Sequence, residues 1–242
     1  MGVVSVDLAY KDYRNIGIAV LKDARDGISC EFVQLSIGGE PVPGELARAL
    51  VNLCEKYDSN LLLLDGPQGW RADKGSHPHS RDCERKLNTP AKTGMPSIVK
   101  PVNYAPFAVF SIAVFDALGG QGWQRLSDDP SRIDLSQKWA IESFPRAAWL
   151  ALGSPALRAK RKTGEQDIKD GVEIITKKFE VHMTRFPNHD ELQALVAGLA
   201  GVWLARRDFG MIEAVGLPPR LENGTWREGF ILNPRNRAIQ PR

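Results

Sequence analysis

The sequence has few cysteines and no strong excess of charge of either sign. Its three cysteines are Cys30, Cys54 and Cys83, and no pair shows a C-x-x-C spacing. Neither a disulfide framework nor a cysteine metal site is therefore indicated. The formal net charge is only +3. This falls short of the basic excess of a dedicated nucleic-acid-binding protein, although it permits a polyanionic substrate.

Long hydrophobic runs are missing as well. The most apolar segment, residues 104–118, is too short to span a bilayer and contains Asp116. The chain opens directly on a strand-like run, without a basic region followed by an apolar stretch. We therefore expect no membrane association and a cytoplasmic location.

Several well-known motifs are absent from the sequence. It contains no G-x-x-x-x-G-K-[ST] and no G-x-G-x-x-G segment, which disfavours P-loop and Rossmann proteins. It also contains no H-E-x-x-H and no G-x-S-x-G segment, so zinc proteases and α/β-hydrolases are disfavoured. Candidate functional residues must therefore come from the predicted fold.

The 242 residues suit one large domain, because no linker interrupts the chain. Three strand-like runs joined by short polar turns predict an antiparallel meander over residues 3–9, 15–21 and 29–37. Apolar residues at helical spacing predict a helix over 46–57, and the apolar run 61–64 is typical of a buried parallel strand.

Helices and strands alternate in the rest of the chain. The expected elements are a helix at 105–118, a strand at 138–144, helices at 146–152, 168–180 and from about 188, and a strand at 228–232. This order predicts an α/β fold: a mixed sheet of three antiparallel strands followed by parallel strands, with helices on both faces. We expect a single domain with a long irregular insertion at 68–103 and a small C-terminal extension at 210–242.

Acidic residues stand at the predicted strand ends. Asp7, Asp65 and Glu142 follow strands that would be neighbours, so their carboxylates should converge at one edge of the sheet. Asp190, in the first turn of the last long helix, could add a fourth carboxylate. Such carboxylates repel one another unless a hard cation binds them, which predicts a site for Mg²⁺ or Mn²⁺.

This set of four acids predicts catalysis as well as metal binding. Two ions ~3.5–4 Å apart would activate a water and stabilise the leaving oxygen of a phosphodiester. Taken singly, each acid also has an ordinary structural explanation, as a residue beside a turn or at a helix N-terminus. The prediction therefore depends on the set.

Basic residues in two predicted loops are candidates for binding substrate phosphates. They are Arg81, Arg85 and Lys86 in the first loop, and Lys160 and Lys162 in the second. The alternative is a solvated surface without a ligand.

Six segments of the chain together resemble the predicted-nuclease family catalogued as domain of unknown function 429. In order they are Val3–Ala9, Leu64–Trp70, Arg81–Glu84, Glu142–Ala147, His189–Leu195 and Glu228–Ile231. The resemblance spans nearly the whole chain. It implies a ribonuclease H-like fold, as in the Holliday-junction resolvases.

By this resemblance Asp7 is the strand-one acid, Asp65 the strand-four acid and Asp190 the helix acid, and Glu142 matches the family's Glu before its proline segment. One position differs. The family's last helix reads His-Asp-x-x-Asp-Ala, and here Gln193 replaces the second Asp. A Gln offers a neutral oxygen but no charge, which bears on whether a second metal ion binds.

Three functions stay open from the sequence. The first is a metal-dependent nuclease acting on nucleic acid. A homodimer would fit this function, because junction resolvases act as homodimers. The second is a non-catalytic module on the same fold that binds nucleic acid or protein, which Gln193 and the modest charge favour. The third is an actin-like ATPase or phosphotransferase, but those proteins usually need a second comparable domain, for which this chain is too short.

Overall fold

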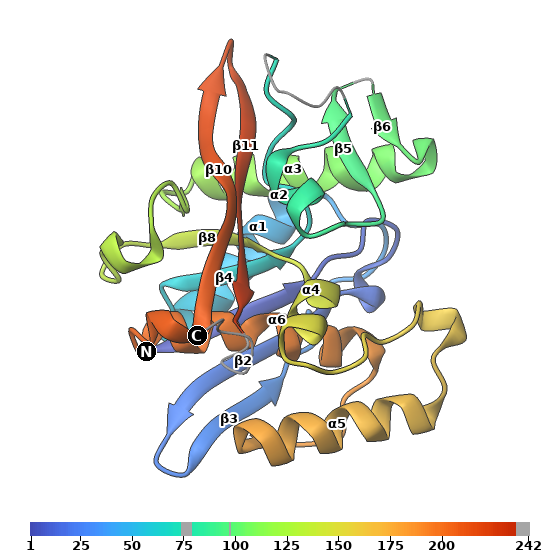
Figure 1. Ribbon diagram of the computed structural model, residues 1–242, viewed down its shortest axis with the longest axis vertical. Coiled ribbons are helices and arrows are strands. Elements are labelled where there is room, and N and C mark those ends of the chain that lie inside the picture. The colour runs from blue at the N-terminus through green and yellow to red at the C-terminus, as the bar shows by residue number, and fades with distance from the viewer. Residues whose placement is uncertain (74–78, 97, 236–242) are drawn as a thin grey trace, which may run out of the picture.

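The computed structural model describes residues 1–73, 79–96 and 98–235 (Figure 1). Within these ranges, nine strands form one mixed sheet in the order β10-β11-β8-β4-β1-β2-β3-β9, with β7 beside β8. The strands are β1 (Gly2–Asp7), β2 (Gly17–Ala24), β3 (Gly27–Phe32), β4 (Leu61–Asp65), β7 (Gln124–Arg125), β8 (Trp139–Ser143), β9 (Val181–Met183), β10 (Ile212–Glu222) and β11 (Thr225–Pro234). The expected mixed α/β sheet is confirmed.

The centre of the sheet follows from two sequence patterns. The short polar turns make β1, β2 and β3 an antiparallel meander, as expected. The four leucines of β4 are fully buried, which is the environment of a parallel strand covered on both faces. Strand β4 lies between β1 and β8 and pairs parallel with both, so the expected neighbours are confirmed.

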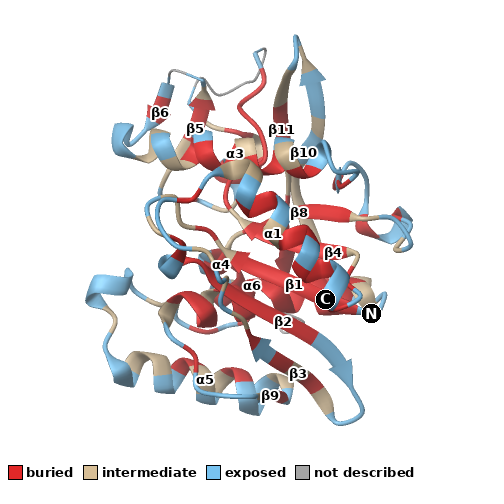
Figure 2. Ribbon diagram, turned by 180° about the vertical axis from the view of Figure 1, so that it is seen from behind, coloured by how far each residue is buried: buried red, intermediate tan, exposed pale blue. Residues whose placement is uncertain are grey.

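Helices cover both faces of the sheet (Figure 2). Helices α1 (Pro43–Lys56) and α3 (Ala105–Gly119) pack on the face that presents Val4, Val6 and Leu64. Helices α4 (Pro145–Ala151), α5 (Glu165–Phe179) and α6 (His189–Ala205) cover the face that presents Val3 and Leu63. Successive strand residues thus pack in two separate hydrophobic cores, because side chains alternate between the faces of the sheet.

The expectation that this apolar segment is too short to span a bilayer is wrong by length and composition, because the helical segment Val102–Gly119, which includes α3, is long and apolar enough to cross a membrane. Its Phe110, Val114 and Phe115 are instead buried in the core between α1 and the sheet. One side of α3 thus packs in this core, and 39% of the apolar window is buried inside the structure.

Helix α6 lies directly against the strands that carry the candidate acids. A Cβ atom at Gly198 would lie 2.6 Å from Cδ1 of Leu21 and 2.8 Å from Cβ of Ser5, so only glycine fits at this contact. The helix begins with the expected capping box: Glu191 N donates to Oδ1 of Asn188 at 3.0 Å, and Asn188 N donates to Oε2 of Glu191 at 2.9 Å.

Two regions are more ordered than expected. The segment 68–103 contains α2 (Asp82–Lys86) and the hairpin of β5 (Lys92–Met95) and β6 (Ile98–Lys100), with residues 74–78 and 97 outside the described part. The segment after residue 210 forms the long hairpin β10–β11, and β11 joins the main sheet beside β8 (Figure 1).

Strand boundaries also differ at the meander's outer edge. Strand β3 ends at Phe32 rather than residue 37, and the three-residue strand β9 pairs with it. A strand this short has too few residues to show a period-two pattern.

Candidate metal centre

Two carboxylates face each other where β1 and β4 end. Asp7 and Asp65 are direct partners in the parallel register of these strands, so their side chains project from the same face of the sheet. This is the face that α6 covers. Each carboxyl group shifts the pKa of the other.

The pKa values of Asp7 and Asp65 are both raised in the folded protein. Burial, followed by the negative charges of Asp65 and Asp190, holds the pKa of Asp7 well above its usual range. Burial also raises the pKa of Asp65 to about 7; the hydrogen bond with Asp7 lowers it, and the charge of Glu142 raises it further. Near neutral pH the pair therefore retains a proton that two separate aspartates would lose.

Helix α6 brings the third acid to this edge. Ligand atoms of Asp7, His189 and Asp190 all lie within 4.8 Å of one another. The approach depends on Gly17, which pairs with Asp7 across β1 and β2. A Cβ atom at Gly17 would lie 2.2 Å from the carbonyl carbon and oxygen of Asp190.

Sequence reasoning did not identify Gly17 as part of this site. A glycine at the start of a predicted strand is the signal that could have done so, because it often marks a close backbone approach.

Asp190 is held by two side chains. The Nδ1 atom of His189 lies 2.9 Å from Oδ1 of Asp190, and the ammonium of Lys160 donates to Oδ2. Burial would raise the pKa of Asp190, but these two contacts outweigh it, so the pKa is lowered. Lys160 also donates to Oδ1 of Asn15 at 3.0 Å.

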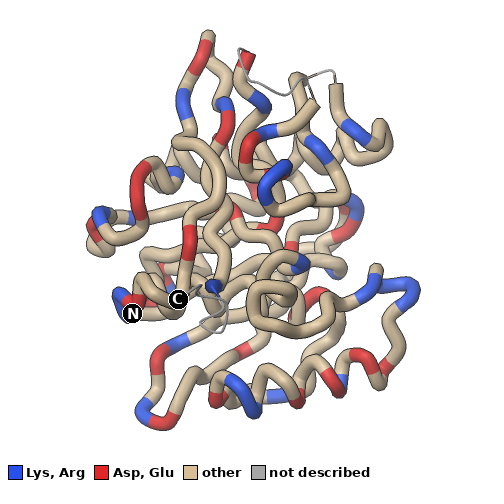
Figure 3. The backbone as a smooth tube through the Cα atoms, in the orientation of Figure 1, with Lys and Arg blue, Asp and Glu red and all other residues tan. Residues whose placement is uncertain are grey.

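Residues 158–163, named here the basic turn, include four Lys and Arg residues, and Lys160 of this turn bonds to Asp190. Figure 3 shows how Lys, Arg, Asp and Glu are distributed along the chain. The Nε2 atom of His189 lies 3.0 Å from the backbone oxygen of Arg158, so His189 joins this turn to α6. Lys160 and Lys162 are both exposed. Of the predicted phosphate-binding residues, Lys160 contacts a carboxylate of the site, and Lys162 lies two residues further along the same turn.

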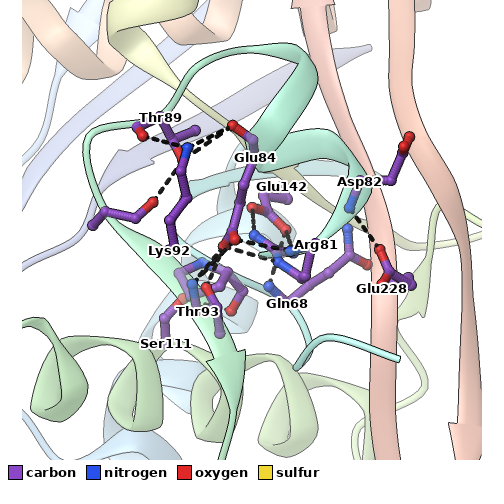
Figure 4. A network of polar contacts seen from close by, with 12 residues as sticks. Gln68, Arg81, Asp82, Glu84, Thr89, Lys92, Thr93, Ser111, Glu142 and Glu228 are labelled. Atoms are coloured by element: carbon purple, nitrogen blue, oxygen red, sulfur yellow. Dashed lines mark hydrogen bonds and ion pairs between the residues drawn. The ribbon is translucent and has the colours of Figure 1, made fainter. Parts of the chain in front are cut away.

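Glu142 projects from the opposite face of the sheet. It pairs with Leu64 in the register of β4 and β8, whereas the partner of Asp65 is Ser143. The Glu142 side chain is buried and accepts hydrogen bonds from Nη1 and Nη2 of Arg81, both at 2.7 Å, and from Gln68 N at 3.0 Å. The structure thus pairs Asp7 with Asp65 and places Asp190 close to Asp7. It gives Glu142 to a separate ion pair with Arg81 (Figure 4).

The predicted phosphate-binding residues of the 68–103 segment are also engaged elsewhere. Arg81 is 1% exposed, and its Nε donates to Glu84 at 3.1 Å in addition to the bonds with Glu142. Arg85 and Lys86 form ion pairs with Asp82, at 2.7 and 2.8 Å, on the surface of α2.

Buried acids fix this segment to the rest of the fold (Figure 4). Glu84 accepts from Thr93 N at 3.0 Å, which joins α2 to β5. Glu228 of β11 accepts from Ala72 N and from Asp82 N, both at 3.0 Å. These bonds satisfy backbone N–H groups that would otherwise be buried without partners.

A cavity of about 120 Å³ is lined by Asp65 and also by the Arg81–Glu142 pair. Its aromatic walls are Tyr104, Phe107 and Phe144. Ser143, which also lines it, is 1% exposed, and its hydroxyl has no hydrogen-bond partner in the described part of the chain.

Asp7, His189 and Asp190 offer two carboxylates and an imidazole nitrogen within 4.8 Å of one another. Asp65, the register partner of Asp7, adds a carboxylate on the same face of the sheet. Carboxylate oxygens are the ligands that suit a hard divalent cation such as Mg²⁺ or Mn²⁺.

Gln193, the position at which the sequence departs from the family that it resembles, is engaged by a neighbouring helix. Oε1 of Gln193 accepts from Nε1 of Trp149 at 2.8 Å, a contact between α6 and α4. Comparisons with protein-family models, with curated proteins and with solved structures give no match. The family membership therefore stays a prediction, and the geometry of the site carries the functional assignment.

Proposed function

We propose that this chain is a ribonuclease H-like nuclease that hydrolyses phosphodiester bonds of nucleic acid with the help of Mg²⁺ or Mn²⁺. The observation that carries the proposal is the row of Asp7 and Asp65, in register at the ends of adjacent parallel strands, with Asp190 alongside. The order of the central strands, β3-β2-β1-β4-β8, supports the ribonuclease H-like fold.

Each residue of the site has a role in this proposal. Asp7, Asp65 and Asp190 would hold the cation, whose charge would favour the ionised forms of Asp7 and Asp65. A bound divalent cation would supply Lewis-acid activation of the phosphodiester. The exposed Lys160 and Lys162 would contact phosphate oxygens of the substrate, since ammonium groups bind phosphate as point charges.

The reaction would take place in the cytoplasm. All three cysteines, Cys30, Cys54 and Cys83, are buried free thiols, as is common in reducing compartments. The modest net charge of +3 restricts the basic surface to local features such as the basic turn.

One observation favours a non-catalytic module that binds nucleic acid. Both carboxylate oxygens of Asp190 already have partners, His189 and Lys160. A module of this kind would bind nucleic acid equally well in chelator and would cleave none with any metal.

Cleavage of labelled oligonucleotides tests the proposal. Single-stranded, duplex and four-way-junction DNA, and RNA, are incubated with Mg²⁺, Mn²⁺ or EDTA. We expect Asp7→Asn to reduce metal-dependent cleavage at least ~100-fold, because the variant loses a ligand charge at the reacting centre. The matched control is Asp26→Asn, an exposed aspartate on the β2–β3 turn, which should cleave like the wild type. Cleavage by Asp7→Asn at the wild-type rate would refute the assignment.

A further inference from the structure

The carboxylates at this edge are too few for two divalent ions. Glu142 is engaged by Arg81 on the other face, and Gln193 is neutral and bonded to Trp149. The remaining acids, Asp7, Asp65 and Asp190, carry three negative charges when fully ionised.

A cation of the chain itself already occupies one side of this row. The Lys160 ammonium bonds to Asp190 Oδ2 and, at 3.0 Å, to Oδ1 of Asn15, so oxygens from two separate segments fix its position. It also lies close enough to Asp7 to lower the pKa of that carboxyl. One divalent ion together with Lys160 balances three carboxylates, whereas two ions and Lys160 would exceed them by two charges.

The place of Lys160 in the fold keeps it accessible to a substrate. Its side chain is 52% exposed, while that of Asp190 is 9% exposed. The third N–H of the ammonium is therefore free to meet a phosphate oxygen while the other two stay on protein oxygens. The basic turn is anchored independently, because His189 binds the backbone oxygen of Arg158.

We propose that the site holds a single divalent ion and that Lys160 supplies the second positive charge, contacting a phosphate oxygen of the substrate. The catalytic part of this inference rests on the nuclease function proposed above. Its metal-binding part is independent of activity.

Titration with Mn²⁺, with free ion measured by electron paramagnetic resonance, tests the inference. The wild type should bind one ion per chain at this site. Lys160→Met should also bind one ion, about fivefold more tightly, because a competing ion pair of up to about 1 kcal/mol with Asp190 is removed. In cleavage assays it should lower kcat at least ~10-fold, and Lys160→Arg, which retains the charge, should recover part of the loss.

Arg161→Met is the matched control on the same turn, because Arg161 is exposed and has no contact with Asp190 among the described bonds. It removes one positive charge but not the contact with Asp190, so its Mn²⁺ affinity should equal that of the wild type. Two Mn²⁺ ions per wild-type chain, or a Lys160→Met variant identical to Arg161→Met in Mn²⁺ affinity and kcat, would overturn the inference. One tightly bound ion without cleavage of any nucleic acid would retain the charge arrangement and refute the nuclease function.

Discussion

Replacing Asp65 by Asn should make the metal-free protein more stable at alkaline pH. The pKa of Asp65 rises from its usual 3.8 to about 7 in the folded protein, chiefly through burial. A carboxyl with a raised pKa keeps its proton in the folded state over a pH range in which the unfolded chain has released it. Its favourable contribution is complete below about pH 4 and is lost as the pH rises through 7.

The size of the effect follows from the pKa. A rise of about three pH units corresponds to about 4 kcal/mol of unfolding free energy, and the partial exposure of Asp65 reduces this to about 2–4 kcal/mol. Asn does not titrate, and its neutral side chain also relieves the repulsion on Asp7. The free energy of unfolding of Asp65→Asn, relative to that of the wild type, should therefore be about 2–4 kcal/mol higher at pH 8 than at pH 4.

Urea denaturation in EDTA at both pH values measures this double difference, in which groups that do not interact with Asp65 cancel. At pH 8 the gain corresponds to roughly 5–10 °C in melting temperature. Saturating Mn²⁺ should reverse the order, since only the wild type retains the ligand. Equal pH dependence of the two proteins in EDTA would refute the shared-proton description of the pair.

Two further substitutions test the surroundings of the site. Gly17→Ala places a methyl group against the backbone of Asp190, so we expect a loss of about 1–3 kcal/mol and of the Mn²⁺-induced rise in melting temperature; an unchanged rise would contradict the role of Gly17. Glu142→Gln leaves Arg81 without its carboxylate partner, so urea denaturation should show a loss of about 3–5 kcal/mol. Mn²⁺ affinity of the folded Glu142→Gln protein should be unchanged; loss of Mn²⁺ binding with full stability would instead place Glu142 among the metal ligands.

Part of the site could be predicted because it depends on local patterns. The apolar runs that end in Asp7 and Asp65 identify two buried strands, and the capping box at Asn188 and Glu191 identifies the start of the helix that carries Asp190. Adjacent parallel strands then bring these acids to one edge of the sheet, whatever the details of packing.

The position of Glu142 could not be predicted, because it depends on strand register. Side chains alternate between faces, so the pairing of Asp65 with Ser143 rather than with Glu142 turns Glu142 to the opposite face. Nothing in either strand's own sequence specifies this pairing.

The helix and the hairpin within residues 68–103 could not be predicted for a similar reason. They are fixed by bonds such as Asp82 N to Glu228, between residues 146 positions apart, and not by an apolar period.

The central claim is that Asp7, Asp65 and Asp190 form a metal site, and melting curves of wild type and Asp7→Asn in Mn²⁺, Mg²⁺ and EDTA test it most directly. A ligand that binds only the folded state at 100 times its Kd adds about 2.7 kcal/mol, or roughly 5–10 °C for a chain of this size. We predict this rise in the wild type with either metal and none in Asp7→Asn. A wild type that melts at the same temperature in metal and in EDTA, or an equal rise in both proteins, would contradict the account.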